Sequence, residues 1–340
     1  MARFLLLGYY GYGNAGDEAL LYTISSCLAE NGHELGVLTA DCRGTERLLS
    51  FCEVRTFHRT SPLSIVQALL WADVLVLGGG SLLQDVTSAK SLHYYLGIIR
   101  LAKLLGKPYA LFAQGLGPFV RRGSKEKAAK AAKGAAFVSV RDLRSKELLL
   151  EEGLAEVELV SDPVWALPVE KLTANSAGSY LLFALRPWQG KEERLVGAIK
   201  RLRQEVDLPF VFAAMQPELD LPLAEKLAQK VGGEVAAAGD LPSLLEVFAG
   251  ARLVCAMRLH ALVFAALLGK ETVAISYDPK VDALAEELGL AALDISEELC
   301  LGKAAADAKI SQHKIEAQKK RAARGLEFLV KLGRKLDGKS

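Results

Sequence analysis

The stretch RFLLLGYYGYGNAGDEAL, residues 3–20, decides the fold, because an apolar run passes through a glycine-rich loop into a helical pattern. Within it, Gly11, Gly13 and Gly16 satisfy the pattern GxGxxG, which requires this strand–loop–helix context to be informative. Glycines let the backbone approach a ligand, and a helix N-terminus favours an anion. The stretch therefore predicts the opening unit of a doubly wound α/β domain.

Working outward, short apolar runs alternate with amphipathic stretches along most of the chain, as in βαβ units of a parallel sheet. The first series predicts strands at 3–7, 34–39, 74–77, 109–113, 137–140 and 157–160, and helices at 17–30, 91–105 and 143–151. The second series predicts strands at 180–185, 209–214, 252–255 and 272–276, and helices at 191–204, 221–231, 242–248 and 258–268. Residues 304–336 are predicted to be helical throughout.

These patterns predict an α/β protein with two Rossmann-like doubly wound domains facing a cleft, in a GT-B-like arrangement. A length of 340 residues suits two domains. Pro163, Pro168 and the linker-like segment 173–179 separate the two series. We expect an N-terminal, acceptor-side domain at 1–172, a donor-side domain at 173–300 and a basic C-terminal helix at 301–340.

Charge is unevenly distributed, although the net charge is only +2. Residues 303–340 carry 11 Lys/Arg against 4 Asp/Glu, while the rest of the chain is mildly acidic. This basic segment is either a solvated helix face or a surface for an anionic membrane or substrate.

Cysteine content and hydropathy indicate a cytoplasmic protein. The five cysteines form no CxxC pair and suit reduced thiols, while no His/Asp/Glu cluster has metal-ligand spacing. No apolar run reaches about 18 residues, and the N-terminal run is typical of a strand rather than of a signal peptide. We expect no metal and no cofactor.

The opening loop ends in two polar residues that allow several interpretations. A dinucleotide site would use an acid such as Asp41, but the Asp17 carboxylate would repel a pyrophosphate. Asp17 is either an N-cap or a general base for a sugar hydroxyl. Tyr10 and Tyr12 either offer aromatic faces to a sugar or pack in the core.

Further candidates follow other predicted strands, at the edge where open α/β sheets bind ligands. They are Gly79 and Gly80 in a triple-glycine turn, Gln114, Arg141, Arg186, the neighbours Arg258 and His260, and Lys280. Arginine and histidine beside a helix N-terminus indicate a pocket for phosphate or carboxylate. Arg141 alternatively pairs with Asp142 or caps a helix, and Lys280 is alternatively a surface residue.

Together these segments resemble the bacterial polysaccharide pyruvyl transferase family, in order and over roughly residues 3–290. The matching segments are 11–20 (GYGNAGDEAL), 78–85 (GGGSLLQD), 114–118 (QGLGP), 140–142 (VRD), 161–163 (SDP), 257–261 (MRLHA) and 277–280 (YDPK). The sequence looks most like the branch that modifies secondary cell-wall polysaccharide and supports anchoring of surface-layer proteins.

The resemblance implies a specific reaction. Phosphoenolpyruvate would be the donor, and the product a pyruvate ketal on O4 and O6 of N-acetylmannosamine in a lipid-linked precursor. If the basic C-terminal segment binds a membrane, it would hold the enzyme at the inner membrane face, where such a precursor would lie. Arg141, His260 and Lys280 match donor-binding positions and Asp17 the acceptor base. From the residues themselves we expect Arg258 to bind the donor as well, and His260 to act both in donor binding and in catalysis.

Less specific expectations concern the acceptor and the rival functions. Gly13, Asn14, Gly16, Gly79, Gly80, Gln114 and Arg186 are expected to contact the acceptor or shape its loops. The main alternative is a nucleotide-sugar-dependent glycosyltransferase of the same fold. A non-catalytic sensor and a dinucleotide-dependent oxidoreductase are weaker alternatives, and no nucleic-acid partner is expected.

Overall fold

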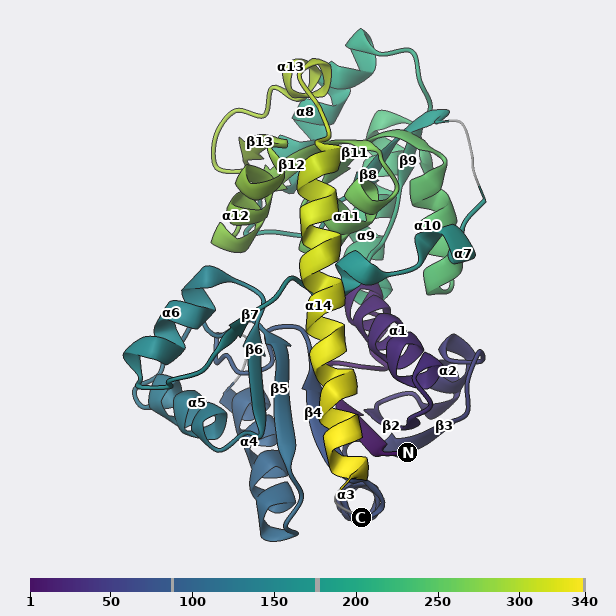
Figure 1. Ribbon diagram of the computed structural model, residues 1–340. Coiled ribbons are helices and arrows are strands. Elements are labelled where there is room, and N and C mark those ends of the chain that lie inside the picture. Colours follow the sequence, from purple (N-terminus) through teal and green to yellow (C-terminus); the bar gives the residue numbers. More distant parts are fainter. Residues whose placement is uncertain (87–88, 175–177, 339–340) are drawn as a thin grey trace. The chain divides into compact units, whose positions relative to one another are not determined.

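The computed structural model describes residues 1–86, 89–174 and 178–338, which form two compact units (Figure 1). Unit 1 contains residues 1–12, 17–167 and 318–340, and unit 2 contains residues 13–16 and 168–317. The tip of the opening loop, residues 13–16, thus belongs to unit 2, although the strand before it belongs to unit 1.

Unit 1 is built on a parallel sheet whose described strands follow the order β3-β2-β1-β4-β5-β6-β7. The strands are β1 (Arg3–Leu7), β2 (Glu34–Thr39), β3 (Val54–His58), β4 (Val74–Gly78), β5 (Tyr109–Gln114), β6 (Phe137–Val140) and β7 (Glu158–Leu159). The helices are α1 (Ala15–Glu30), α2 (Cys42–Leu48), α3 (Pro62–Trp71), α4 (Ala89–Leu104), α5 (Ser124–Lys133) and α6 (Leu143–Glu151), with a 3-10 turn at Pro163–Ala166. This strand order is that of a Rossmann-type sheet, whose ligands bind beyond the carboxyl ends of the strands.

Both faces of this sheet are covered, as the continuous apolar runs predict. Leu5 and Leu7 of β1 pack into a core that includes α4 and α5, whereas Phe4 and Leu6 pack into a second core with α1. The helix α14 (Gln312–Asp337) also joins the second core, through residues such as Leu326. Each strand therefore alternates its side chains between two buried layers.

Unit 2 repeats the arrangement, with the order β10-β9-β8-β11-β12-β13 among its described strands. These are β8 (Tyr180–Ala184), β9 (Phe210–Phe212), β10 (Glu234–Val235), β11 (Ala251–Ala256), β12 (Glu271–Ser276) and β13 (Ala291–Asp294). The helices are α7 (Val169–Leu172), α8 (Glu192–Glu205), α9 (Pro217–Val231), α10 (Leu241–Ala249), α11 (Leu259–Leu267), α12 (Pro279–Leu288) and α13 (Leu301–Ala306). All described strand pairs in both units are parallel. The predicted class, α/β with two doubly wound Rossmann-like sheets, is confirmed.

The C-terminal region differs from the expectation of a continuous, separate helix. Residues 307–311 interrupt it between α13 and α14, because Ala304 and Ala308 pack into the core of unit 2 while Leu326 packs into unit 1. The units also divide the chain differently from the expected boundaries 1–172, 173–300 and 301–340. The expected linker at 173–179 falls partly on residues 175–177, which lie outside the described residues.

Two general expectations can be compared with the described chain. All five cysteines are free thiols, and burial raises the pKa of Cys255 to about 12. In the described ranges, no helix is sufficiently long and apolar to cross a membrane.

Candidate functional site

The first part of the glycine-rich loop, residues 8–12, packs against the ends of neighbouring strands of unit 1. Tyr10 is fully buried, and its hydroxyl donates to the Gly78 carbonyl at 2.6 Å, so Tyr10 is a packing residue rather than a sugar platform. Gly11 has a φ of +78°, and an added Cβ would lie 2.4 Å from the Asp41 backbone nitrogen. Only glycine fits this close approach.

Glu18, for which the sequence predicted no role, stabilises this loop through a hydrogen bond. Its Oε1 accepts from the Gly11 backbone N–H at 2.8 Å. Burial, the largest cause, raises the pKa of the Glu18 carboxyl to about 7, against the lowering effect of that hydrogen bond. The neighbouring Asp17 carboxylate raises it further. The Glu18 carboxyl group, which contacts the loop at Gly11, therefore has a pKa near neutral pH.

Asp17 lies in the first turn of α1 and is not its N-cap. The helix begins at Ala15, and Asn14 Oδ1 accepts from the Gly16 backbone N–H at 3.1 Å, as a capping side chain does. The N-cap alternative for Asp17 is therefore wrong. A Cβ placed on Gly80 would lie 3.6 Å from Asp17 Oδ1, so Asp17 points at the glycine turn after β4.

The glycine turn after β4 is positioned by Gln114. The Gln114 side chain is fully buried, and its Nε2 lies within hydrogen-bonding distance of the carbonyls of Leu77 (3.1 Å), Gly79 (2.9 Å) and Phe112 (3.2 Å). Gly79 has a φ of +76°, which favours glycine. Gln114 therefore shapes the backbone of the loop beside Asp17.

An aromatic cluster that includes Tyr12 stands beside the loop. Tyr12 stacks on Tyr9 with ring centroids 4.3 Å apart and an interplanar angle of 15°. The guanidinium of Arg59, which is only 5% exposed, lies 5.1 Å from the Tyr12 ring and donates to the Gly8 carbonyl at 2.6 Å and to the Tyr95 hydroxyl at 3.2 Å. Arg59 was not predicted because the edge strand β3 before it was not recognised.

Arg141, at the end of β6, is an ion-paired residue of unit 1. Its Nη1 donates to Asp162 Oδ2, and its Nη2 donates to Ser81 Oγ at 3.1 Å. The expected alternative of pairing with Asp142 is wrong, because Asp142 caps α6 by accepting from the Ser145 backbone N–H. Asp41, proposed for a dinucleotide ribose, likewise caps α2.

In unit 2, two predicted arginines follow adjacent strands in register. Ala184 of β8 pairs with Ala256 of β11, and Arg186 and Arg258 each lie two residues further along. The Nε atoms of both guanidinium groups are buried and make no hydrogen bond within the described residues. Two unsatisfied N–H donors thus occur at one edge of this sheet, where a ligand would bind.

Arg258 and His260 are held by neighbours that the sequence did not reveal. Arg258 Nη2 donates to Asp220 Oδ1 at 2.6 Å, and Asp220 is fully buried. The ring of His260 lies against Gly16, where an added Cβ would meet His260 Nδ1 at 2.0 Å. The Ala15 backbone N–H donates to the Met215 carbonyl at 2.8 Å. The loop tip is therefore packed within unit 2 against His260.

The two other predicted cations of unit 2 are Arg186, which contacts aromatic side chains, and Lys280, which is partly exposed. Arg186 Nη1 donates to the Tyr277 hydroxyl at 3.1 Å, and its guanidinium carbon lies 5.6 Å from the Trp188 ring. Lys280 has a side chain that is 49% exposed, near the start of α12, and it pairs with Asp278 at 3.7 Å. Lys280 is therefore a partly exposed side chain that already has a carboxylate partner on its own segment.

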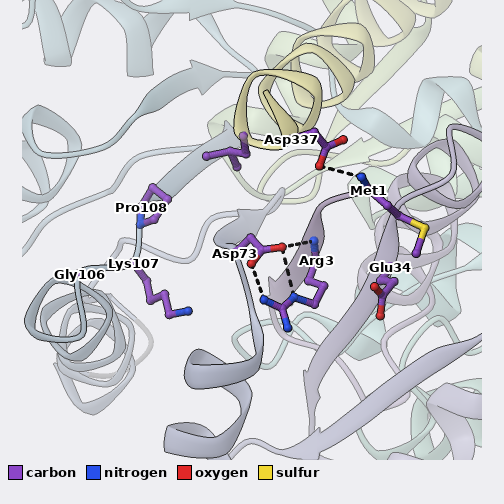
Figure 2. Close-up of a pocket in the computed structure, with 9 residues that line it drawn as sticks. Met1, Arg3, Glu34, Asp73, Gly106, Lys107, Pro108 and Asp337 are labelled. Atoms are coloured by element: carbon purple, nitrogen blue, oxygen red, sulfur yellow. Dashed lines mark hydrogen bonds and ion pairs between the residues drawn. The ribbon is translucent and has the colours of Figure 1, made fainter. Parts of the chain in front are cut away.

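A pocket of about 530 Å³ lies at the opposite, amino edge of the unit 1 sheet (Figure 2). Two of its cationic groups already have protein counter-ions, since Arg3 pairs with Asp73 at 2.7 Å and the Met1 amino group pairs with Asp337 at 3.0 Å. The hydrogen bond from Arg3 lowers the pKa of Asp73. This pocket therefore offers less to an ionic ligand than the carboxyl edge of unit 2.

Solved structures with a similar fold include sugar-nucleotide epimerases. UDP-GlcNAc 2-epimerase from Methanocaldococcus jannaschii matches with a TM-score of 0.66 and 14% identity, over 97% of this chain and 99% of that chain. The enzyme from Neisseria meningitidis, bound to UDP-GlcNAc, gives 0.63 and 13%, over 95% and 99%. A putative UDP-N-acetylglucosamine 2-epimerase from Listeria monocytogenes gives 0.64 and 12%, over 94% and 91%. At these identities the likeness concerns the fold alone.

No curated protein sequence matches the chain. The sequence model of the family described as polysaccharide pyruvyl transferase, however, matches residues 14–279, well over half of the chain. The match begins at the capping Asn14 and includes Arg141, Arg186, Arg258 and His260. The chain therefore belongs to the polysaccharide pyruvyl transferase family and is an enzyme with pyruvyl transferase activity.

Proposed function

We propose that this enzyme transfers a pyruvyl group from phosphoenolpyruvate to a saccharide, forming a cyclic ketal and releasing phosphate. The observation that supports the donor best is the pair of buried, unsatisfied guanidinium Nε–H groups on Arg186 and Arg258. Both lie at the carboxyl edge of the unit 2 sheet, and Arg258 directly precedes helix α11. Phosphoenolpyruvate carries a phosphate and a carboxylate, the groups that guanidinium donors and helix N-termini bind.

The reaction balances with two sugar hydroxyl groups as the nucleophiles. Protonation of the donor's methylene carbon makes the adjacent carbon electrophilic, and the first hydroxyl oxygen bonds to it. The bond from that carbon to the phosphate oxygen then breaks, and the second hydroxyl oxygen closes the ketal. Of the two hydroxyl protons, one replaces the proton taken up by carbon and the other leaves with the phosphate. The residues must therefore accept protons from sugar oxygens and supply them to the donor.

We assign the acceptor base to Asp17 and the phosphate contact to His260, which also protonates the departing phosphate. Asp17 sits in the first turn of α1 and points at the Gly80 turn, where backbone can approach a sugar closely. Gly13, Asn14, Gly16, Gly79, Gly80 and Gln114 shape these loops. Arg141 and Lys280 remain part of the proposed donor set, in spite of their ion pairs.

We propose a lipid-linked N-acetylmannosaminyl precursor of cell-wall polysaccharide as the acceptor. The exposed face of α14 supports contact with an anionic lipid surface, because it presents basic residues on a helix whose other face is buried. These exposed residues are Lys320, Arg321, Arg324, Lys331, Arg334 and Lys335. Juxtamembrane basic residues contribute roughly 1 kcal/mol each on such a surface.

The reaction is tested by phosphate release from phosphoenolpyruvate with and without a lipid-linked β-N-acetylmannosaminyl disaccharide, followed by mass spectrometry of that acceptor. The expected result is acceptor-dependent release, with an acceptor mass gain equal to the mass of phosphoenolpyruvic acid minus that of phosphoric acid. Consumption of a nucleotide-sugar without phosphoenolpyruvate turnover would instead establish the glycosyltransferase alternative. His260→Ala and Asp17→Ala should each abolish most turnover in folded protein, and near-normal turnover in both would overturn the assigned roles.

Membrane contact is tested by substitution rather than deletion, since α14 also fills the core of unit 1 through Leu326 and Leu329. Lys320, Lys331 and Lys335 are exposed. The triple variant with glutamine at these positions should pellet with anionic vesicles several-fold less than wild type, at equal melting temperature. Equal pelleting of the two proteins would refute the contact.

A further inference from the structure

We propose that Arg186 binds the carboxylate of the donor, beside a phosphate subsite at Arg258 and His260. This inference rests on phosphoenolpyruvate being the donor. It changes the expected role of Arg186, which the sequence placed with the acceptor. It rests on three features of the described residues: the charge of Arg186, its orientation and its register with Arg258.

The first feature is charge. Arg141 is paired with Asp162 and Arg258 with the buried Asp220, so both carry a protein counter-ion. Arg186 makes no ion pair with any described residue, although it is partly buried and its Nε is fully covered. A buried charge without a counter-ion is costly, and a bound anion would remove that cost. Arg186 is therefore the strand-end arginine of this set that is left with an unsatisfied charge.

The second feature is orientation. Arg186 Nη1 donates to the Tyr277 hydroxyl at 3.1 Å, and the guanidinium carbon lies 5.0 Å from the Tyr277 ring and 5.6 Å from the Trp188 ring. The two rings pack together with centroids 4.6 Å apart. These contacts fix the guanidinium plane while leaving the Nε–H without a protein acceptor. A fixed, planar donor group suits a carboxylate, which accepts two parallel hydrogen bonds.

The third feature is register. Because Ala184 pairs with Ala256 and the Met257 backbone N–H donates to the Ala184 carbonyl at 3.1 Å, Arg186 and Arg258 start from adjacent strand ends. Neighbouring strands lie about 4.8 Å apart. In phosphoenolpyruvate, the phosphate oxygen and the carboxylate are attached to the same carbon, so its two anions are also close neighbours. Two arginines at adjacent strand ends therefore match a donor with two adjacent anions.

The experiment separates the two subsites with two inhibitors. Inorganic phosphate occupies the phosphate subsite alone, whereas 2-phosphoglycolate occupies both. Arg186→Met should weaken binding of phosphoglycolate and raise the KM for phosphoenolpyruvate by about 10- to 100-fold, as expected for a charged hydrogen bond. Inorganic phosphate should inhibit this variant almost as it inhibits wild type. Arg258→Met should weaken both inhibitors.

Controls distinguish a specific contact from a loss of charge or of fold. Arg252→Met removes the same charge from an exposed position near the amino end of β11 and should change neither inhibitor. Arg186→Lys keeps the charge but loses the planar fork, and should recover less than half of the lost binding energy. Tyr277→Phe removes only the hydroxyl that orients Arg186 and should raise the donor KM a few-fold without changing the acceptor KM.

Three results would overturn the inference. They are unchanged phosphoglycolate binding in Arg186→Met, equal weakening of both inhibitors, and a raised acceptor KM with a normal donor KM. Calorimetry on wild type keeps this test separate from that of the proposed function. If wild type binds neither phosphoenolpyruvate nor phosphoglycolate, the proposed donor is wrong, whereas equal binding by wild type and the folded variant refutes only the role of Arg186.

Discussion

Gly16→Ala is expected to inactivate the enzyme through His260 while leaving the fold largely intact. An added Cβ would lie 2.0 Å from His260 Nδ1, 2.4 Å from Cγ and 2.8 Å from Cε1, all far inside normal contact. Because Cγ is the base of the ring, rotation of the ring about its own axis cannot relieve the overlap. Either the imidazole must leave its position or the loop tip must move away from it.

The two consequences differ in size. Overpacking of this kind costs about 1–3 kcal/mol of stability. Gly16 is helical in α1, so alanine returns up to about 1 kcal/mol through its better helix propensity. The net loss of stability should therefore be about 2 kcal/mol or less. Displacing a reacting group by about 1 Å costs on the order of 100-fold in rate, so the effect on activity should be much larger than the effect on folding.

The assay is acceptor-dependent phosphate release, with urea unfolding measured on the same samples. Gly197→Ala is the matched control, because this glycine lies in helix α8 of the same unit and its Cβ would approach only Arg201 Nη1, at 3.9 Å. It should retain full activity and gain up to about 1 kcal/mol. In a His260→Ala background, where the clash is absent, Gly16→Ala should change sign and become stabilising. Turnover of Gly16→Ala within three-fold of wild type, or a destabilisation of the same size in both backgrounds, would refute this account.

Three further outcomes can be measured on single variants. Asp220→Asn removes the buried counter-ion 2.6 Å from Arg258. The kcat/KM for the donor should fall at least 10-fold. In a double-mutant cycle, Asp220→Asn should cause no further loss of kcat/KM when Arg258 is already replaced by Met. Glu18 has a folded pKa raised to about 7, so its contribution to stability is complete below about pH 4.5 and is lost as the pH rises through 7. Urea titrations at pH 5 and pH 8 should show wild type losing on the order of 2 kcal/mol relative to Glu18→Gln. Gln114→Glu would face three carbonyl oxygens with a carboxylate, and its melting temperature should fall far more than that of Gln114→Met.

The sequence predicts the central strands well because they are buried on both faces. Such strands appear as continuous apolar runs, and β1, β2 and β6 occur at the predicted residues. The edge strand β3 has only exposed and half-buried positions, so it produces no such run. The strand β10 has only two residues. Missed edge strands matter for the site, because Arg59 follows β3 directly.

The break before α14 shows how packing overrides local propensity. Residues 307–311 contain neither proline nor glycine, so the apolar periodicity alone predicts one helix. Ala308 nevertheless packs into the core of unit 2, and the backbone N–H of Ile315 donates to the Ser311 carbonyl at 3.1 Å. Serine directly before a helix is a favoured N-cap residue. Ser311 was therefore a signal for a new helix start that periodicity concealed.

The site residues show a different limit of the sequence. A position at a strand end can be predicted, because parallel strands bring their carboxyl ends to one edge of their sheet. Arg141 lies at this edge of the unit 1 sheet, and Arg186 and Arg258 lie at this edge of the unit 2 sheet. Which arginine keeps a free charge depends on carboxylates that are distant in sequence. Asp162 lies 21 residues from Arg141, and Asp220 lies 38 residues from Arg258.

This difference in charge has a functional consequence. An arginine that is paired to a buried aspartate is held in a fixed position and binds an anion with reduced net charge, which favours precise placement over affinity. An arginine that is oriented only by aromatic rings and a hydroxyl, as Arg186 is, keeps its full charge for the ligand. An enzyme that holds its donor tightly through one anionic group, while the other anionic group departs as phosphate, would need both kinds of arginine. In the proposed reaction the carboxylate stays with the product, where the uncompensated Arg186 would hold it, whereas the phosphate would leave the compensated Arg258. We therefore expect the role of each arginine to be set by its counter-ion.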